Sequence, residues 1–327
     1  MPLWPFLAAV VGAGVVSGVG TRLVIPYLRR AGVAAAPNER SLHRVPTPHG
    51  GGVGPVSAIV LVWLAVVIAG WRPTRDLMIL AGAVVLAVVS WLDDRYELSP
   101  ATRLAPQIVV VALSLGLVPL GGPVFQFWLP PVLDRIVAGF GWLWFINLFN
   151  FMDGADGLVG SEAAAIGVGI ALVVAPLDPA TALLGTALAA AGLGFLASNW
   201  APARVFMGDV GSIPLGYLVG FLLLRLAALG MWQAALILPL YFLADATITL
   251  GRRAVRGEKV WQAHRQHFYQ RAVLAGLGHA AMVGRVIAAN LALLACAWAA
   301  GNGYGIAGLG AACLVVAILL VVLARAR

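Results

Sequence analysis

Long apolar runs alternate with short polar segments along the whole chain. A helix needs about 20 mostly apolar residues to cross a bilayer, and runs of this kind predict eleven membrane spans. A count of ten stays open, because the fifth run is short and Arg225 blurs the boundary after the eighth. The predicted spans are 3–28, 52–70, 76–92, 104–120, 136–151, 158–175, 179–198, 212–230, 232–250, 283–300 and 304–323. The pattern predicts an all-α polytopic integral membrane protein with one transmembrane domain over residues 1–327.

Composition supports this class and excludes others. The chain is 61% hydrophobic and only 10% charged, whereas a soluble domain carries about 25% charged residues. The net charge of +8 comes from Arg residues scattered over short loops, so it predicts membrane topology rather than nucleic-acid binding. Cys296 and Cys313 lie in apolar runs without metal-ligand spacing. A soluble domain, a disulfide scaffold and a nucleic-acid binder are thereby excluded.

The basic residues divide unequally between the two sides of the membrane. Alternating the loops places together 29–51, 93–103, 152–157, 199–211, 251–282 and the C-terminus. Most Lys and Arg residues lie in these segments, while the other side holds only Arg72, Arg75 and Arg135. Positively charged loops remain in the cytoplasm. We therefore expect these segments to be cytoplasmic and the N-terminus to be outside.

Polar residues typical of catalysis lie on the same side. They are Asp93 and Asp94 in WLDDR, Asn147, Asn150, Asp153 and Asp156 in NLFNFMDGADGL, Asp209 in FMGDVGS, and His264 and His267 in HRQHFYQR. These motifs are remote in sequence, yet the predicted topology brings them to one membrane face. We therefore expect a composite site built from the loops 29–51, 93–103, 147–157, 199–211 and 251–282.

The residue types in these motifs indicate a magnesium-diphosphate site. Asn147, Asn150 and Asp153 are three residues apart, so neighbours share a face if the helix continues. Clustered carboxylates repel one another and are costly to bury unpaired. Mg²⁺ resolves this conflict, because it takes oxygen ligands from one or two carboxylates and from substrate phosphates. Phosphoryl transfer requires mainly charge neutralisation and in-line positioning, which such a site provides.

Each motif taken alone has a structural alternative. The acidic pair at a helix end can be solvated, DGADG can be a turn, and Asp209 can cap a helix. His264 and His267 lack the further ligands of a zinc site. Asp245 lies within the ninth predicted span, where it is either functional or paired with a helix-end residue such as Arg252.

The motifs together resemble a known family. The order PNERSLHRVPTPHGGG, WLDDR, NLFNFMDGADGLVGSE, FMGDVGS and HRQHFYQ, over roughly residues 37 to 271, resembles the polyprenyl-phosphate N-acetylhexosamine-1-phosphate transferases, glycosyltransferase family 4. The details look most like the O-antigen-initiating branch. The resemblance implies a Mg-dependent phosphoglycosyltransferase of the bacterial plasma membrane, with its active site facing the cytoplasm. Such an enzyme transfers a sugar-1-phosphate from a UDP-N-acetylhexosamine to undecaprenyl phosphate and releases UMP.

The resemblance also implies roles for individual residues. Asp209 would be the main Mg²⁺ ligand, with an oxygen from Asn150 and with Mn²⁺ as a substitute ion. Asp93 and Asp94 would deprotonate or position the lipid phosphate, and which of them is essential stays open. Nucleotide and sugar-diphosphate contacts would fall on Asn147, Asp153, Asp156, His264, Arg265, His267 and Arg271, and lipid-phosphate contacts on Arg40 and His43. The expected partners are the two substrates and the bilayer, with a homodimer compatible with the family.

Several alternatives remain at this stage. A transporter of an anionic solute also has many spans, although carriers place binding residues near the bilayer midplane. A translocase that makes lipid I is a second alternative, but three adjacent His in its last loop are replaced here by HRQH. The mechanism is expected to be a single in-line displacement, with a covalent Asp-phosphate intermediate as the other option. The sequence does not identify the sugar.

Overall fold

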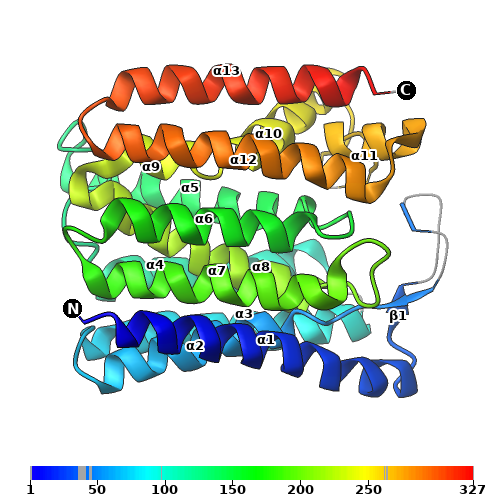
Figure 1. Cartoon of the computed structure of the whole chain (residues 1–327), viewed down its shortest axis with the longest axis horizontal. Helices are drawn as coiled ribbons and strands as arrows, with labels where there is room; N and C mark the ends of the chain where they lie inside the picture. Colours follow the sequence, from blue (N-terminus) through cyan, green and yellow to red (C-terminus); the bar gives the residue numbers. More distant parts are fainter. Residues whose placement is uncertain are drawn as a thin grey trace.

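The computed structural model describes residues 2–35, 42, 43, 46–96, 98–260, 262 and 264–326. Its helices are α1 (Trp4–Arg30), α2 (Val53–Ile68), α3 (Leu77–Tyr96), α4 (Pro100–Leu117), α5 (Pro131–Phe151), α6 (Leu158–Val174), α7 (Pro179–Asn199), α8 (Asp209–Leu226), α9 (Trp232–Ile237), α10 (Leu240–Val255), α11 (Phe268–Ala272), α12 (His279–Gly301) and α13 (Gly305–Ala324). Most of them run along one common direction (Figure 1). The prediction of an all-α polytopic membrane protein is confirmed.

The lengths of the helices agree with a membrane location. Among the described residues, eight helices are long and apolar enough to cross a membrane, and α2 and α6 are shorter apolar helices.

The two short strands β1 (Ala34–Ala35) and β2 (Thr47–Pro48) pair antiparallel at one end of the bundle (Figure 1). This end also carries Asp94, Asp153 and Asp209, and we call it the acidic end.

Small residues allow the helices on one side of the bundle to pack closely. A Cβ on Gly18 of α1 would lie 3.3 Å from the carbonyl oxygen of Gly194 in α7. Gly14, one turn earlier, faces Ala190 of α7 in the same way. Such close contacts stabilise the bundle, because helices without large side chains between them gain dispersion contacts in lipid.

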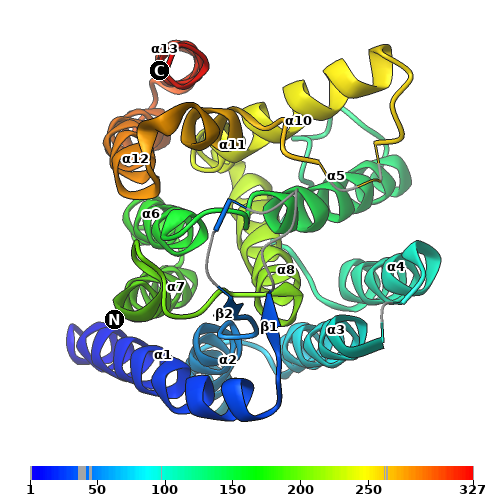
Figure 2. The same ribbon diagram turned by 90° about the vertical axis from the view of Figure 1, so that its right-hand side faces the viewer.

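The predicted ninth span is wrong as a single helix. The segment 232–250 is divided between α9 and α10, and Pro239 lies at the break. Proline has no N–H to continue the helical hydrogen bonds. A five-residue π-helical segment, η2 (Ala227–Met231), joins α8 to α9, and Gly230 in it has a φ of 91°. In Figure 2, α10 extends away from α12 and runs along α5.

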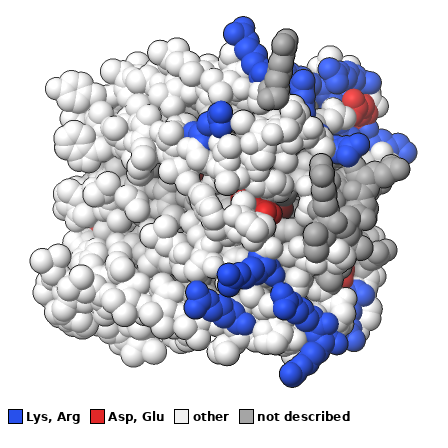
Figure 3. Space-filling view, turned by 45° about the vertical axis from the view of Figure 1, so that its right-hand side comes forward, with Lys and Arg blue, Asp and Glu red and all other residues white. Residues whose placement is uncertain are grey.

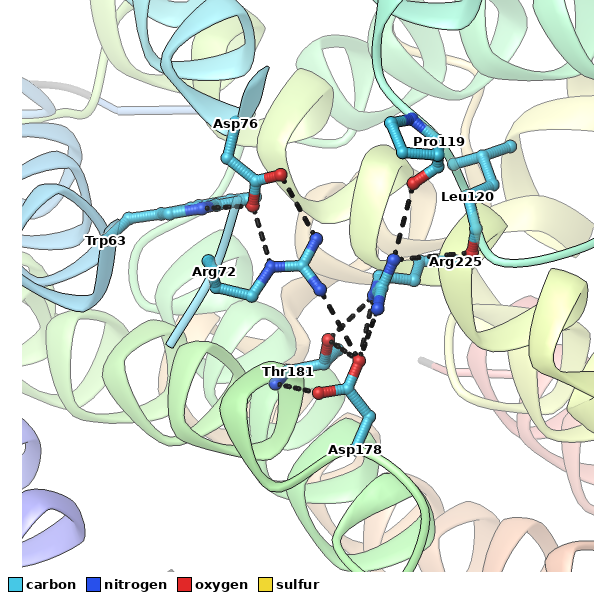
Figure 4. Close-up of polar contacts among 8 residues, drawn as sticks. All are labelled: Trp63, Arg72, Asp76, Pro119, Leu120, Asp178, Thr181 and Arg225. Carbon is cyan, nitrogen blue, oxygen red and sulfur yellow. Dashed lines mark hydrogen bonds and ion pairs between the residues drawn. The ribbon is translucent and has the colours of Figure 1, made fainter. Parts of the chain in front are cut away.

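Two arginines are neutralised by aspartates at the opposite end of the bundle (Figure 4). Nε of Arg72 donates to Asp76 at 2.8 Å, and Nη1 of Arg72 lies 3.5 Å from Asp178. Nε of Arg225 donates to Asp178 at 3.1 Å and to Thr181 at 2.8 Å. Burial raises the pKa of Asp178, but hydrogen bonds from Thr181 and Arg225 outweigh this effect and hold the pKa below its usual range. The cluster therefore ties α7 and α8 to the loop before α3.

We expect Asp178→Asn to lower the free energy of unfolding by about 3 kcal/mol, because removing one partner of a buried ion pair leaves the other charge uncompensated. The activity of each folded molecule should remain, since the acidic end is remote from this cluster. Thermal unfolding in detergent measures the loss. The exposed Arg75 provides a control, because Arg75→Gln should leave the melting temperature unchanged; equal melting temperatures for the two variants would contradict the prediction.

Candidate active site

The start of α8 is the centre of the candidate site. Gly208 precedes the helix with a φ of 71°, a conformation that favours glycine. Asp209 is the first residue of the helix. Nδ2 of Asn150, from the end of α5, donates to Asp209 at 2.8 Å and to Ser212 at 2.9 Å. The amide N–H₂ of Asn150 therefore orients the carboxylate of Asp209. For the amide oxygen of Asn150 to become a metal ligand, the amide group would have to rotate.

Two further carboxylates flank the same helix start. Asp94, near the end of α3, accepts the backbone N–H of Val210. Asp153, just after α5, accepts the backbone N–H of Gly208. Burial raises the pKa of Asp153 well above its usual range, and the nearby charges of Asp209 and Asp94 raise it further. Three acidic side chains thus surround one helix N-terminus and repel one another, which is the arrangement that a bound cation relieves.

The adjacent residues Asp93 and Asp94 face different surroundings. Asp93 is buried, accepts the backbone N–H of Leu98 at 2.8 Å and pairs with Arg103 at 3.2 Å. The carboxylate of Asp93 therefore connects the end of α3 to the following turn and to the start of α4. Asp94 lines a cavity together with Asp153 and Asp209. Of the two, only Asp94 is placed to contact a substrate in that cavity.

Two adjoining cavities meet at Asp153 and Asp209 and also share Gly154 and Gln270, while Asp94 lines the first of them. The first, of about 290 Å³, is also lined by His43 and Phe206, whose rings lie 4.8 Å apart; we call it the aromatic cavity. The second, of about 690 Å³, is lined by Arg103, Asn150, Val260, Gln262, His264, His267 and Tyr269 among others; we call it the basic cavity. Their combined size is in the range that holds nucleotide-sized ligands.

The structure brings together most, but not all, of the predicted site residues. Asn147 donates to Gln107 at 2.8 Å and to the Leu143 carbonyl, so it links α5 to α4 instead of lining either cavity. Arg265 and Arg271 are exposed and line neither cavity. Arg40 lies outside the described residues.

Asp156 lines the aromatic cavity, but its carboxylate is already bonded. It accepts the backbone N–H of Ala203 at 3.0 Å and lies 3.4 Å from Nδ1 of His279. His279 Nδ1 in turn accepts the backbone N–H of Asp156 at 3.0 Å. Asp156 therefore holds the shape of the DGADG loop, and His279 joins this loop to the start of α12.

Sequence reasoning missed His49 as a site residue. Its Nε2 lies 3.9 Å from Asp94, and its ring lines the aromatic cavity. Burial lowers the pKa of His49, although the charge of Asp209 opposes this. The signal was present, because His49 stands directly before the glycines of PTPHGGG. Arg103 and His279 had no comparable signal.

The donor set is compatible with Mg²⁺ as the implied cofactor. Asp209, Asp94 and Asp153 supply hard oxygen atoms, as Mg²⁺ requires. Among the described residues, no three His, Cys, Asp or Glu side chains form a ready-made metal cage. An ion bound here would therefore need water or phosphate oxygens to complete its shell, which is usual for Mg²⁺. The zinc alternative at the histidines gains no support from this part of the chain.

His264 gives the site a pH-dependent stability. Burial, followed by the charges of His267 and Arg253, lowers its pKa to about 4, whereas an unfolded histidine titrates near 6.5. Between these pH values, His264 is protonated in the unfolded chain but not in the folded protein. The free energy of unfolding therefore falls as the pH decreases from about 6.5 towards 4. We expect His264→Gln to reduce the drop in melting temperature between pH 7 and pH 5; an unchanged drop would contradict this.

Comparisons with known proteins agree with the motifs. The family model described as glycosyl transferase family 4 matches residues 77–227. A Bacillus subtilis protein named as a probable undecaprenyl-phosphate N-acetylglucosaminyl 1-phosphate transferase is 29% identical over 83% of this chain and 79% of its own length. A phospho-N-acetylmuramoyl-pentapeptide-transferase of Microcystis aeruginosa is 32% identical, over 71% and 69% respectively. A decaprenyl-phosphate N-acetylglucosaminephosphotransferase of Mycolicibacterium smegmatis is 31% identical, over 64% and 57%.

These similarities define the class of the protein. The chain belongs to glycosyl transferase family 4, the family of polyprenyl-phosphate N-acetylhexosamine-1-phosphate transferases. The matched region runs from α3 to the end of α8, and therefore includes Asp94, Asp153 and Asp209. This membership favours a phosphosugar transferase over a transporter.

Proposed function

We propose that this protein transfers an N-acetylhexosamine-1-phosphate from a UDP-sugar to undecaprenyl phosphate and releases UMP. The observation that carries the proposal is the convergence of Asp94, Asp153 and Asp209 on the N-terminus of α8. Relatives named for the transfer of N-acetylglucosamine phosphate and of phospho-N-acetylmuramoyl-pentapeptide support the same reaction class. An N-acetylhexosamine is common to both.

The proposed chemistry is a single in-line displacement. An oxygen of the lipid phosphate attacks the β-phosphorus of the UDP-sugar, the bond between the β-phosphorus and the bridging oxygen breaks, and UMP leaves with that oxygen. Asp209, with Asn150 beside it, would hold Mg²⁺ or Mn²⁺, whose charge offsets that of the diphosphate. The protein's contribution is mainly positioning and charge neutralisation, as is general for phosphoryl transfer.

The side chains that line the two cavities fit these roles in positioning and charge neutralisation. Asp94 borders the aromatic cavity beside Asp209, where we propose that it positions the lipid phosphate. A phosphate monoester is largely dianionic near pH 7, so its oxygen attacks without prior removal of a tightly held proton. His43 lines the same cavity, and its role at the lipid phosphate stays a proposal. Arg103, His264 and His267 line the basic cavity, where we propose that they face the diphosphate and sugar.

We further propose that the acidic end faces the cytoplasm of a bacterial plasma membrane. Lys and Arg side chains gather around this end in Figure 3, while the flank of the bundle is mostly uncharged. Positive charge of this kind marks the cytoplasmic side, where UDP-sugars are found. The lipid-linked product would initiate an envelope polysaccharide of the O-antigen type, with lipid I as the alternative product.

Release of UMP by the purified protein tests the proposal. The reaction would contain undecaprenyl phosphate, Mg²⁺ and a panel of UDP-amino sugars, with and without EDTA. We expect UMP only when the lipid, one or more of the sugars and the metal are all present. If UDP-N-acetylmuramoyl-pentapeptide were the one donor in the panel that gave UMP, the protein would catalyse the lipid I reaction instead. If folded protein released no UMP with any donor of the panel, the proposal would be contradicted.

A further inference from the structure

Asp245 is a completely buried carboxylate that the proposed chemistry does not use. It lies in α10, one and a half turns after the break at Pro239, and is 0% exposed. Five groups surround its two oxygens. Oδ1 accepts from the Phe268 backbone N–H at 3.0 Å, from Nδ1 of His267 at 3.1 Å and from the Thr249 hydroxyl at 3.3 Å. Oδ2 accepts from the Tyr269 backbone N–H at 3.2 Å and from the Tyr241 hydroxyl at 3.3 Å. Such a complete set of donors is what a buried carboxylate requires.

The helix-end pairing with Arg252, left open by the sequence, is not formed. The guanidinium of Arg252 lies over the ring of Phe268, 5.0 Å from its centre. Among the described residues, the basic side chain in contact with Asp245 is His267, whose Nδ1 lies 3.1 Å from Oδ1. The carboxylate therefore acts on α11 and the residue before it, which belong to the motif HRQHFYQR.

His267 is the connection between Asp245 and the site. Its ring is 2% exposed and lies between His264 and Tyr269, with ring centres 4.8 and 5.6 Å away. The ring also lines the basic cavity, together with Asp209 and Asn150. A carboxylate on Nδ1 places the proton of a neutral imidazole on that nitrogen and fixes the rotation of the ring. Nε2 is then the nitrogen available to a ligand in the cavity.

We propose that Asp245 is a positioning residue for the transfer reaction: it fixes the tautomer and orientation of His267, so that the unprotonated Nε2 of His267 accepts a hydrogen bond from a hydroxyl or amide N–H of the nucleotide sugar. This inference rests on the function proposed above. The same carboxylate holds the Phe268 and Tyr269 amides, and Tyr269 Oη donates to the Phe151 carbonyl at 3.1 Å. Asp245 thereby also fixes the HRQHFYQR segment against the end of α5.

A double-mutant cycle tests the coupling. Asp245→Asn keeps the volume but removes the charge and one of the acceptor oxygens, and we expect kcat/KM for UMP release to fall about 100-fold, the usual consequence of a misplaced catalytic contact. His267→Gln should cause a similar loss. In the His267→Gln background, Asp245→Asn should cost less than about threefold, because the residue through which it acts is already absent. A purely structural role would give independent, multiplying losses.

Thr249→Val is the matched control, since it removes a donor to the same carboxylate without touching His267. We expect its kcat/KM to stay within about twofold of the unchanged protein. If Asp245→Asn does not fold, the cycle is repeated with Asp245→Glu, which keeps the charge and moves the carboxylate by one methylene. Independent losses in the cycle, or full activity of the Asp245 variant, would overturn the inference. Failure of the unchanged protein to release UMP would instead contradict the proposed function.

Discussion

Replacement of Asp209 by Asn is expected to lower kcat for UMP release about 1,000-fold, at the upper end of the effect of losing one preorganised electrostatic contact. The reason is the position of this carboxylate, where α3, α5 and α8 meet and both cavities open. Asn keeps the size of the side chain and an oxygen for the hydrogen bond from Asn150. The loss would therefore reflect the missing negative charge. Initial rates at saturating substrates measure it, with thermal unfolding as the test of folding.

Glu258 provides a control carboxylate in the same part of the molecule. It pairs with Arg253 at 2.8 Å in the loop after α10 and lines neither cavity. Glu258→Gln also removes one negative charge, but we expect kcat to change less than about twofold. If Asp209→Asn retained more than a tenth of the activity, the start of α8 could not be the centre of the reaction.

Gly52→Ala is expected to damage both stability and activity. A Cβ at this position would overlap Cα of Gly211 and approach the Met207 carbonyl oxygen at 2.9 Å. Because these atoms belong to the backbone, they cannot move aside as a flexible side chain would. We expect a loss of about 1–3 kcal/mol, as for other overpacked interiors, and about a 100-fold fall in kcat/KM because the start of α8 and Asp209 would be displaced.

The matched control is Gly116→Ala in α4, where a Cβ would meet no atom within 4 Å. Alanine favours the helix over glycine by about 1 kcal/mol, so the melting temperature should not fall and activity should persist. Thermal unfolding and UMP release are measured for both variants. Equal behaviour of the two would show that the contact of α2 with α8 does not hold the site.

Hydrophobic patterning was sufficient to predict the helical membrane architecture, but it did not predict where helices break. Apolar side chains occupy both α9 and α10, so the run 232–250 reads as continuous. The interruption comes from local backbone chemistry at Gly230 and Pro239. The separate direction of α10 brings Asp245 against His267.

Topology also explains how far the site could be predicted. One-sided placement of the motifs was enough to bring Asp94, Asp153 and Asp209 together. It could not separate Asp93 from Asp94, because neighbouring residues on a helix point about 100° apart and only packing decides which one faces the cavity. Nor could it show that Asn147 bonds to Gln107, a contact that depends on how α4 and α5 lie side by side.

In the proposed reaction, the β-phosphate travels with the sugar to the lipid. This transfer is tested most directly with a UDP-N-acetylhexosamine that carries radiocarbon in the sugar and radioactive phosphorus in the β-phosphate. We expect both labels to enter the lipid product in equal amounts and UMP to be released unlabelled. Asp209→Asn should prevent both the labelling of the lipid and the release of UMP. Sugar label alone in the lipid, with labelled UDP released, would mean ordinary glycosyl transfer and would contradict the proposed transfer of sugar-1-phosphate.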